Sequence, residues 1–135
     1  MIDSFSLRQF VTAIGKVSDF ELDSKKSEQT SLLFKLIDTN NQLLEEINQL
    51  QSQDHITHDM QEDLDLYRET ILENKQVLLD QIARIQAIND ELVTRGIMNR
   101  DSKLREEQKL LDDIAEKDAE NKARQGEQEE EGVYL

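Results

Sequence analysis

Two stretches of this sequence carry apolar residues at alternating steps of three and four, and the two series mirror one another. Such steps are typical of a coiled-coil seam, in which one stripe of each helix faces a partner helix. Where opposed positions are paired, as in Leu50 with Leu64 or Leu22 with Leu92, the two position numbers add up to 114. An antiparallel arrangement requires a constant sum, because opposed residues are equally far from the turn. The sequence therefore predicts an antiparallel helical hairpin over residues 18–96.

The turn of this hairpin is indicated in two ways. The constant sum centres it at residue 57, and residues 52–59 are a polar stretch that is poor in helix-forming residues. Because the two observations are independent, we place the turn within residues 52–59.

Asn40 and Asn74 also oppose one another, which brings two carboxamides together inside an apolar seam. A polar pair of this kind can fix the register of two helices at some cost in stability. The alternative is that polar residues fall at seam positions by chance, as Lys26 and Gln81 do. We favour the register role for Asn40 and Asn74.

The composition agrees with long helices throughout. The sequence has no proline, and aromatic residues make up only 4% of it, so a large core built on rings is not available. An interior proline would cost a helix about 3 kcal/mol. We therefore predict an all-α fold in which the coiled-coil hairpin is flanked by three further segments. They are a short helix over residues 1–16, a weak helix over 97–124 and a disordered acidic tail over 125–135.

Many apolar residues fall outside the paired seam positions, so two helices alone cannot cover them. Exposed apolar patches usually mark contacts, and the N-terminal helix is too short to be stable by itself. We predict that residues of this stripe and of the N-terminal helix contact a partner. They are Phe5, Phe10, Ile14, Ile37, Leu44, Leu72 and Leu79. The alternative is that they pack on one another or on a second copy of the chain.

No pattern in the sequence points to catalysis or to a cofactor. There is no cysteine and no glycine-rich phosphate loop. His55 and His58 lie close to two aspartates, but zinc requires three or four organised ligands, so we interpret this stretch as a solvated loop. We expect a protein that is not an enzyme and that holds no metal or cofactor.

The net charge of the chain indicates which kinds of molecule it can bind. Thirty acidic and sixteen basic residues give a net charge of −14. This field repels nucleic acid and anionic membranes, and it attracts basic protein surfaces. The first residues lack the basic flank and apolar run of a signal peptide. We expect a cytoplasmic protein with access to the nucleus that binds neither nucleic acid nor membrane directly.

The sequence ends with Val133, Tyr134 and Leu135. An apolar residue followed by tyrosine and a final residue resembles the tail with which proteasomal ATPases and activators dock on the proteolytic core ring. So short a pattern ends roughly one chain in a hundred by chance. Docking and coincidence both remain open for these three residues.

Two blocks of the sequence carry a family resemblance. The first block is Phe10, Ala13, Ile14, Ser18, Asp19, Glu21 and Leu22, and the second is Asp63, Leu64, Leu66, Tyr67, Arg68, Glu73, Asn74, Val77 and Leu78. Together with the gap between them, these residues resemble the fungal translation-machinery-associated protein 17 family, also described as a proteasomal ATPase-dedicated assembly chaperone. The resemblance covers residues 5 to about 92.

The resemblance implies a stress-linked assembly chaperone. Members of the family bind one ATPase subunit of the proteasome's regulatory base near its N-terminal coiled coil, favour its pairing with the neighbouring ATPase subunit, and then leave. The family name also records association with ribosomes. Composition and heptads alone fit equally well a permanent structural subunit of a tethering or kinetochore-type assembly, and they fit a monomer as well as a homodimer.

Overall fold

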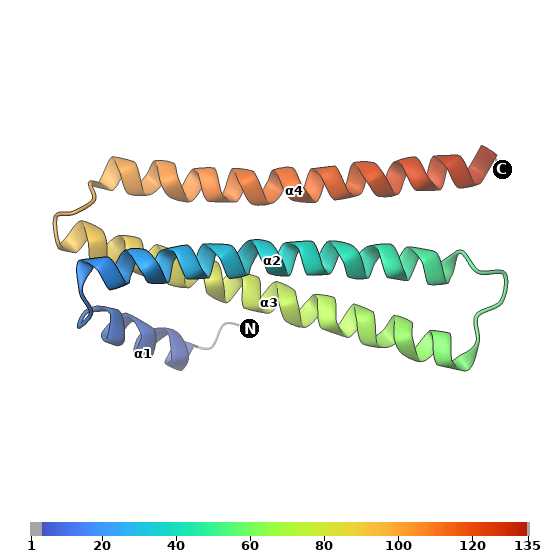
Figure 1. The fold of residues 1–135 in the computed structure, drawn as a ribbon, viewed down its shortest axis with the longest axis horizontal. Coiled ribbons are helices and arrows are strands. Elements are labelled where there is room, and N and C mark those ends of the chain that lie inside the picture. The colour runs from blue at the N-terminus through green and yellow to red at the C-terminus, as the bar shows by residue number, and fades with distance from the viewer. Residues whose placement is uncertain (1–3, 135) are drawn as a thin grey trace.

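The computed structural model describes the backbone of residues 4–134 and the side chains of residues 6–120, and its elements are all α-helices. The helices are α1 (Ser4–Ile14), α2 (Asp19–Gln51), α3 (His58–Thr94) and α4 (Arg100–Tyr134). Figure 1 shows α2 and α3 side by side and running in opposite directions, with α1 folded back against α3 and α4 lying along the other side of the pair. The predicted all-α fold is confirmed.

Local hydrogen bonds and one glycine set the ends of the two central helices. At the start of α2 the Oγ atom of Ser18 accepts a hydrogen bond of 3.2 Å from the backbone N–H of Glu21. At the start of α3 the Oγ1 atom of Thr57 accepts one of 3.2 Å from the N–H of Met60. After α3, Gly96 has a φ of 77°, which a residue with a Cβ rarely adopts, so the helix ends there.

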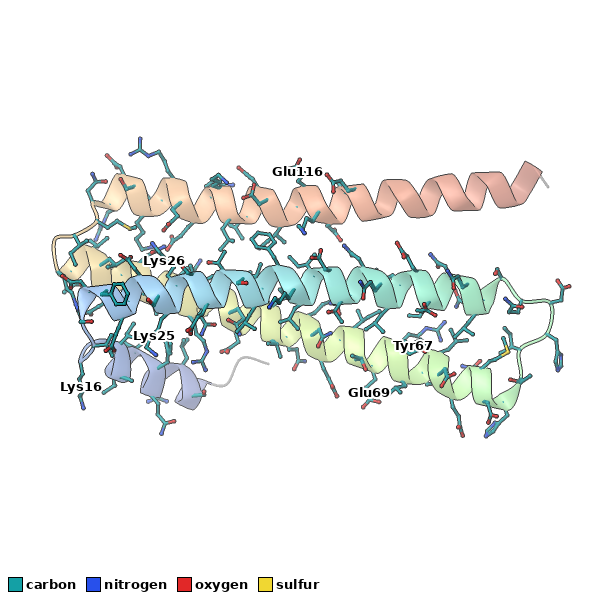
Figure 2. All side chains as sticks on the ribbon, in the orientation of Figure 1. Lys16, Lys25, Lys26, Tyr67, Glu69 and Glu116 are labelled. Carbon is teal, nitrogen blue, oxygen red and sulfur yellow. The ribbon has the colours of Figure 1, made fainter. Side chains whose placement is uncertain are left out.

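The core lies mainly between α2 and α3 and consists of three clusters. They are Ile47, Leu64 and Ile71 near the α2–α3 loop, Leu33, Ile37 and Ile85 in the middle, and Ile14, Leu22, Ile88 and Leu92 at the other end. Tyr67, labelled in Figure 2, packs partly buried against the first cluster. Since α1 contributes Ile14 to the third cluster, burial supplies the stability that so short a helix lacks by itself.

Arg84 of α3 and Arg95, the residue that caps the end of α3, hold α1 and the turn that follows it. The Arg84 guanidinium lies 4.7 Å from the centre of the Phe10 ring and donates a hydrogen bond of 2.9 Å to Ser6 Oγ. Arg95 donates to the carbonyl oxygen of Ile14 at 3.1 Å and to Asp19 at 2.9 Å. The α1–α2 corner is therefore fixed on α3 by cation–π and charge-assisted contacts as well as by apolar packing.

The C-terminal segment differs from the sequence prediction. The sequence predicts a weak helix to residue 124 followed by disorder, whereas α4 extends as one helix from Arg100 to Tyr134. Asn99 begins it, because its Oδ1 accepts a hydrogen bond of 2.7 Å from the N–H of Ser102. The segment is rich in Glu, Gln, Lys, Arg and Ala, which are good helix formers, and it has no proline. Its high charge, which suggests disorder, does not by itself interrupt a helical backbone.

Candidate partner-binding surface

A stripe of exposed leucines lies on α3. Leu72 and Leu79 are seven residues apart, which places them on one face of the helix, and their exposed fractions are 64% and 55%. Val93 lies on the same face two further heptads along, where it lines a hollow with Lys103 and Leu104 of α4. The face is therefore covered by α4 near the end of α3 and uncovered at Leu79 and Leu72.

The structure corrects the prediction for two of the partner-contact residues. Ile14 is 1% exposed and Ile37 is 7% exposed, and both belong to core clusters. Ile14 is buried because α1 docks on α3, and Ile37 because it faces Ile85 across the α2–α3 interface. Neither side chain is accessible to a partner in this arrangement.

The remaining predicted residues divide into two groups. Phe10 and Leu44 are half-buried and pack against the third and first clusters, respectively. The side chains of Phe5, Val133, Tyr134 and Leu135 lie outside the described residues. Of the predicted contact set, Leu72 and Leu79 are thus the members that the described structure leaves largely exposed.

Asn40 and Asn74 meet across the α2–α3 interface. The Nδ2 atom of Asn74 donates a hydrogen bond of 2.9 Å to Oδ1 of Asn40, and Asn40 is 6% exposed. A buried carboxamide that is hydrogen-bonded avoids the penalty of an unsatisfied polar group. The geometry is what a register pair requires, and the register role itself stays a prediction.

A polar network that the sequence analysis missed joins α2, α3 and α4. Asn89 of α3 is fully buried, and its Oδ1 accepts a hydrogen bond of 3.2 Å from Lys26 Nζ of α2. Lys26 also donates to both carboxylate oxygens of Glu106 on α4, at 3.0 and 3.1 Å. Figure 2 shows Lys26 between α2 and α4. The available signal was the spacing of Asn89, four residues after Ile85 and three before Leu92, which is seam spacing.

Next to this network, α2, α3 and α4 line a half-open hollow of about 510 Å³. Thr30, Phe34, Asn89 and Leu110 are among its lining residues. Two buried polar atoms here, Asn89 Nδ2 and Glu107 Oε1, have no hydrogen-bond partner within the described part of the chain. Gln29 Oε1 of α2 and Gln81 Oε1 of α3 are also buried without a partner within the described residues, so unsatisfied polar atoms are not confined to the contact of α4.

Lys103 of α4 pairs with one acid of its own helix and with one acid of α3. Its ammonium group lies 2.9 Å from Glu107 and 3.3 Å from Asp90 of α3. The hydrogen bond to Glu107, helped by the one to Asp90, raises the pKa of Lys103 above its ordinary value. The lysine is therefore held in its charged form where α4 begins to follow α3.

The described residues offer no cluster of three or more histidines, cysteines or acids that could hold a metal ion. His58 instead lies 3.0 Å from Glu62 on the first turn of α3. Within the same residues, no helix is long and apolar enough to cross a membrane. What the geometry presents is an apolar stripe flanked by charged residues, an arrangement suited to contact with another helix.

The family model of the TMA17 helical domain matches residues 6–99. None of the curated proteins and none of the solved structures in the comparison matches the chain. The matched span takes in most of α1 and all of α2 and α3, and it stops just before α4. Because this match covers more than half of the sequence, the chain belongs to the TMA17 family, which the two sequence blocks had indicated.

Proposed function

We propose that this chain is a proteasome assembly chaperone that binds an ATPase subunit of the regulatory-particle base and promotes its pairing with a neighbouring ATPase subunit. It acts in the cytoplasm and the nucleus as a coiled-coil hairpin without a catalytic role. Family membership is consistent with a proteasome-related function. The observation that carries the binding step is the uncovered stripe of Leu72 and Leu79.

The chemistry of this stripe favours a helical partner. An amphipathic helix from the N-terminal coiled coil of an ATPase subunit would lay its apolar side along Leu72 and Leu79, the helix-in-groove mode of recognition. Covering the exposed parts of the two leucines would contribute on the order of 2 to 4 kcal/mol. So small a contribution suits a chaperone that must later leave. The net charge of −14 would speed its encounter with a basic partner.

The decisive experiment measures binding of the purified chain to each purified proteasomal ATPase subunit. We expect one subunit to bind, and we expect the double variant L72D/L79D to weaken that binding at least about tenfold through loss of apolar contact. Helix content and melting temperature should stay unchanged because both side chains are largely exposed. A matched control is L66D/V77D, which adds the same charge at two other exposed positions on a different face of α3.

Each outcome discriminates between functions. Binding that is lost in L72D/L79D and kept in L66D/V77D supports the stripe as the contact. Failure of every ATPase subunit to bind refutes the chaperone. Stoichiometric retention of the chain in a mature coiled-coil assembly would favour a structural subunit instead.

The end of the sequence is tested separately. If Val133, Tyr134 and Leu135 dock on the proteolytic core ring, deleting them should abolish core-particle binding and leave ATPase binding intact. Equal core-particle binding by the shortened chain would show that the resemblance of this tail to docking tails is coincidental. Association with ribosomes and homodimer formation are further expectations, to be checked by co-sedimentation and by light scattering.

A further inference from the structure

The first half of α4 lies in a defined register along the groove between α2 and α3. Lys26 pairs with Glu106, and Asp38 pairs with Lys117 at 2.9 Å. The partners are 80 and 79 positions apart in the sequence, so α4 runs parallel to α2 with almost no drift between these contacts. Against α3 it runs antiparallel, as Figure 1 shows.

The contact of α4 with α2 and α3 buries its side chains only in part. Within residues 100–120, no side chain of α4 reaches the burial of the core residues of α2 and α3. Its apolar contribution to the middle cluster comes from Leu110 and Ile114, which are only partly buried. The unpartnered Asn89 Nδ2 and Glu107 Oε1 lie in the same interface. Such atoms weaken the contact, because a buried polar group without a hydrogen bond is costly.

The groove is also longer than the apolar side of α4. Between Ile114 and Val133 the sequence of α4 contains no large apolar residue. The face of α3 that meets α4 at Asp90 and Val93 continues, however, through Leu79 to Leu72. Counted from the Lys103–Asp90 contact, position 121 lies as far along α4 as Leu72 lies back along α3, while the contacts of α4 beyond Ile114 are with Phe34 and Asp38 of α2. The end of this groove therefore has apolar residues on α3 and no apolar counterpart on α4.

The connection between α3 and α4 is held on α3 as far as Met98, whose N–H donates to the carbonyl oxygen of Leu92, so α4 would separate from the central pair beyond that residue. Gly96 has a positive φ, and no atom lies within 4 Å of the position that a Cβ would take there. The three buried clusters draw their buried residues from α1, α2 and α3, none from the described side chains of α4. Departure of α4 would therefore leave the interior of the central pair in place.

We propose that this groove is the docking site of an amphipathic partner helix, which displaces α4, lies parallel to α2, and also covers Leu79 and Leu72. The contacts of α4 specify the partner's chemistry. The partner helix would carry an acidic residue that pairs with Lys26 and basic residues that pair with Asp90 and Asp38. It would also carry apolar residues with the same spacing as Leu110 and Ile114 of α4. Unlike α4, the partner carries the apolar stripe onward for two more steps. The identity of that partner rests on the proposed function, but the groove can be tested without it.

The test uses the full chain and a fluorescent synthetic peptide with the sequence of residues 100–128. Since the chain has no cysteine, D38C/K117C places a unique pair across the α2–α4 contact, which a short bis-maleimide can join. In a second variant, L110D/I114D, α4 is loosened while the groove residues on α2 and α3 stay native. We expect the peptide to bind L110D/I114D at least about tenfold more tightly than the unmodified chain, and not to bind the cross-linked chain.

A second peptide tests the length of the groove. It carries N121L and Q125L, which extend its apolar stripe toward Leu72, and it should bind L110D/I114D at least about tenfold more tightly than the first peptide. Adding L72D/L79D to the protein should remove this gain. A gain that survives these charges would show that Leu72 and Leu79 do not belong to the groove.

The controls separate this inference from folding effects and from the proposed function. D65C/R68C, cross-linked within α3, carries the same change of charge and should bind the peptide as the unmodified chain does. Circular dichroism should show that L110D/I114D keeps the melting transition of the central pair. Circular dichroism aside, two results would overturn the docking site: equal peptide binding by the cross-linked D38C/K117C chain and by L110D/I114D, or no peptide binding by L110D/I114D.

Binding to proteasomal ATPase subunits tests the proposed function separately. If L110D/I114D binds the peptide but no proteasomal ATPase subunit, the docking site is supported and the proposed function is refuted. If the cross-linked chain and L110D/I114D bind the ATPase subunit equally well, the proposed function is supported and the groove is not its binding site.

Discussion

The α2–α3 interface and the seat of α4 on that pair are built from similar helices but by different chemistry. Leu33 and Ile88 are fully buried between α2 and α3, and the carboxamides of Asn40 and Asn74 satisfy one another. The contact of α4 depends instead on charge pairs whose acids are partly in solvent and on half-buried apolar residues. Burial stabilises in proportion to the apolar area removed from water. Exposed ion pairs contribute little by comparison.

This difference assigns different roles to the two interfaces. An interface built on fully buried apolar residues persists as long as the protein is folded. One that depends on half-buried apolar residues and partly exposed ion pairs opens at low free-energy cost, and such segments are the ones that proteins use for binding and release. The α2–α3 pair is therefore the stable framework of the molecule, and α4 is the helix that we propose a partner displaces.

The largest expected effect is on the free energy of unfolding, when a leucine is shortened to alanine in the α2–α3 interface and, for comparison, in α4. Leu33→Ala should lower the free energy of unfolding by about 2 to 5 kcal/mol, because a fully buried leucine leaves a cavity. Leu110→Ala should cost only about 1 kcal/mol, because that side chain is partly exposed. Urea unfolding followed by circular dichroism measures both, with Leu79→Ala as a surface control near zero. Equal losses for Leu33 and Leu110 would mean that α4 belongs to the core.

The asparagine pair gives the next largest effect. Asn74→Leu should cost about 1 to 3 kcal/mol, because it leaves Asn40 buried and without its partner. Replacing both residues by leucine should raise the melting temperature above that of the native chain and loosen the oligomeric state. Thermal melting and light scattering on the same samples distinguish these effects. A single, unchanged oligomeric state in the double variant would argue against a role in register.

The sequence was informative where apolar periodicity carries the structure. The opposition of Asn40 and Asn74 and the shared cluster of Leu22 and Leu92 both follow from the constant sum of position numbers. The α2–α3 loop, residues 52–57, also falls inside the predicted polar stretch. The partner of a seam residue can be predicted from the sequence because the two opposed residues are equally far from the turn.

The surroundings of this pair were less predictable. Periodicity shows that a helix has a second apolar side but not which element covers it, so the sequence left packing within the chain as an alternative to a partner contact for Ile14, and the docking of α1 shows that packing. The seat of α4 depends on Lys26, Asn89 and Glu106, which in the sequence resemble ordinary polar surface residues. The stripe of Leu72 and Leu79 was predicted because both residues fall outside the seam, and both are exposed.

The smallest expected effect sharpens the electrostatic side of the comparison. Because the pKa of Lys103 is raised in the folded chain, its contribution to stability is fully present below its unfolded pKa of about 10.4 and is lost as the pH rises through the folded value. The melting-temperature gap between the native chain and K103M should therefore be constant up to about pH 10 and shrink above it, with a total contribution below about 1 kcal/mol. K75M, at an exposed position of α3, is the matched control for titration of the other lysines and arginines. If the difference in melting temperature persists at pH 11, the apolar part of the Lys103 side chain, rather than its charge, holds α4. The contact of α4 would then resemble the α2–α3 interface more closely than its ion pairs suggest.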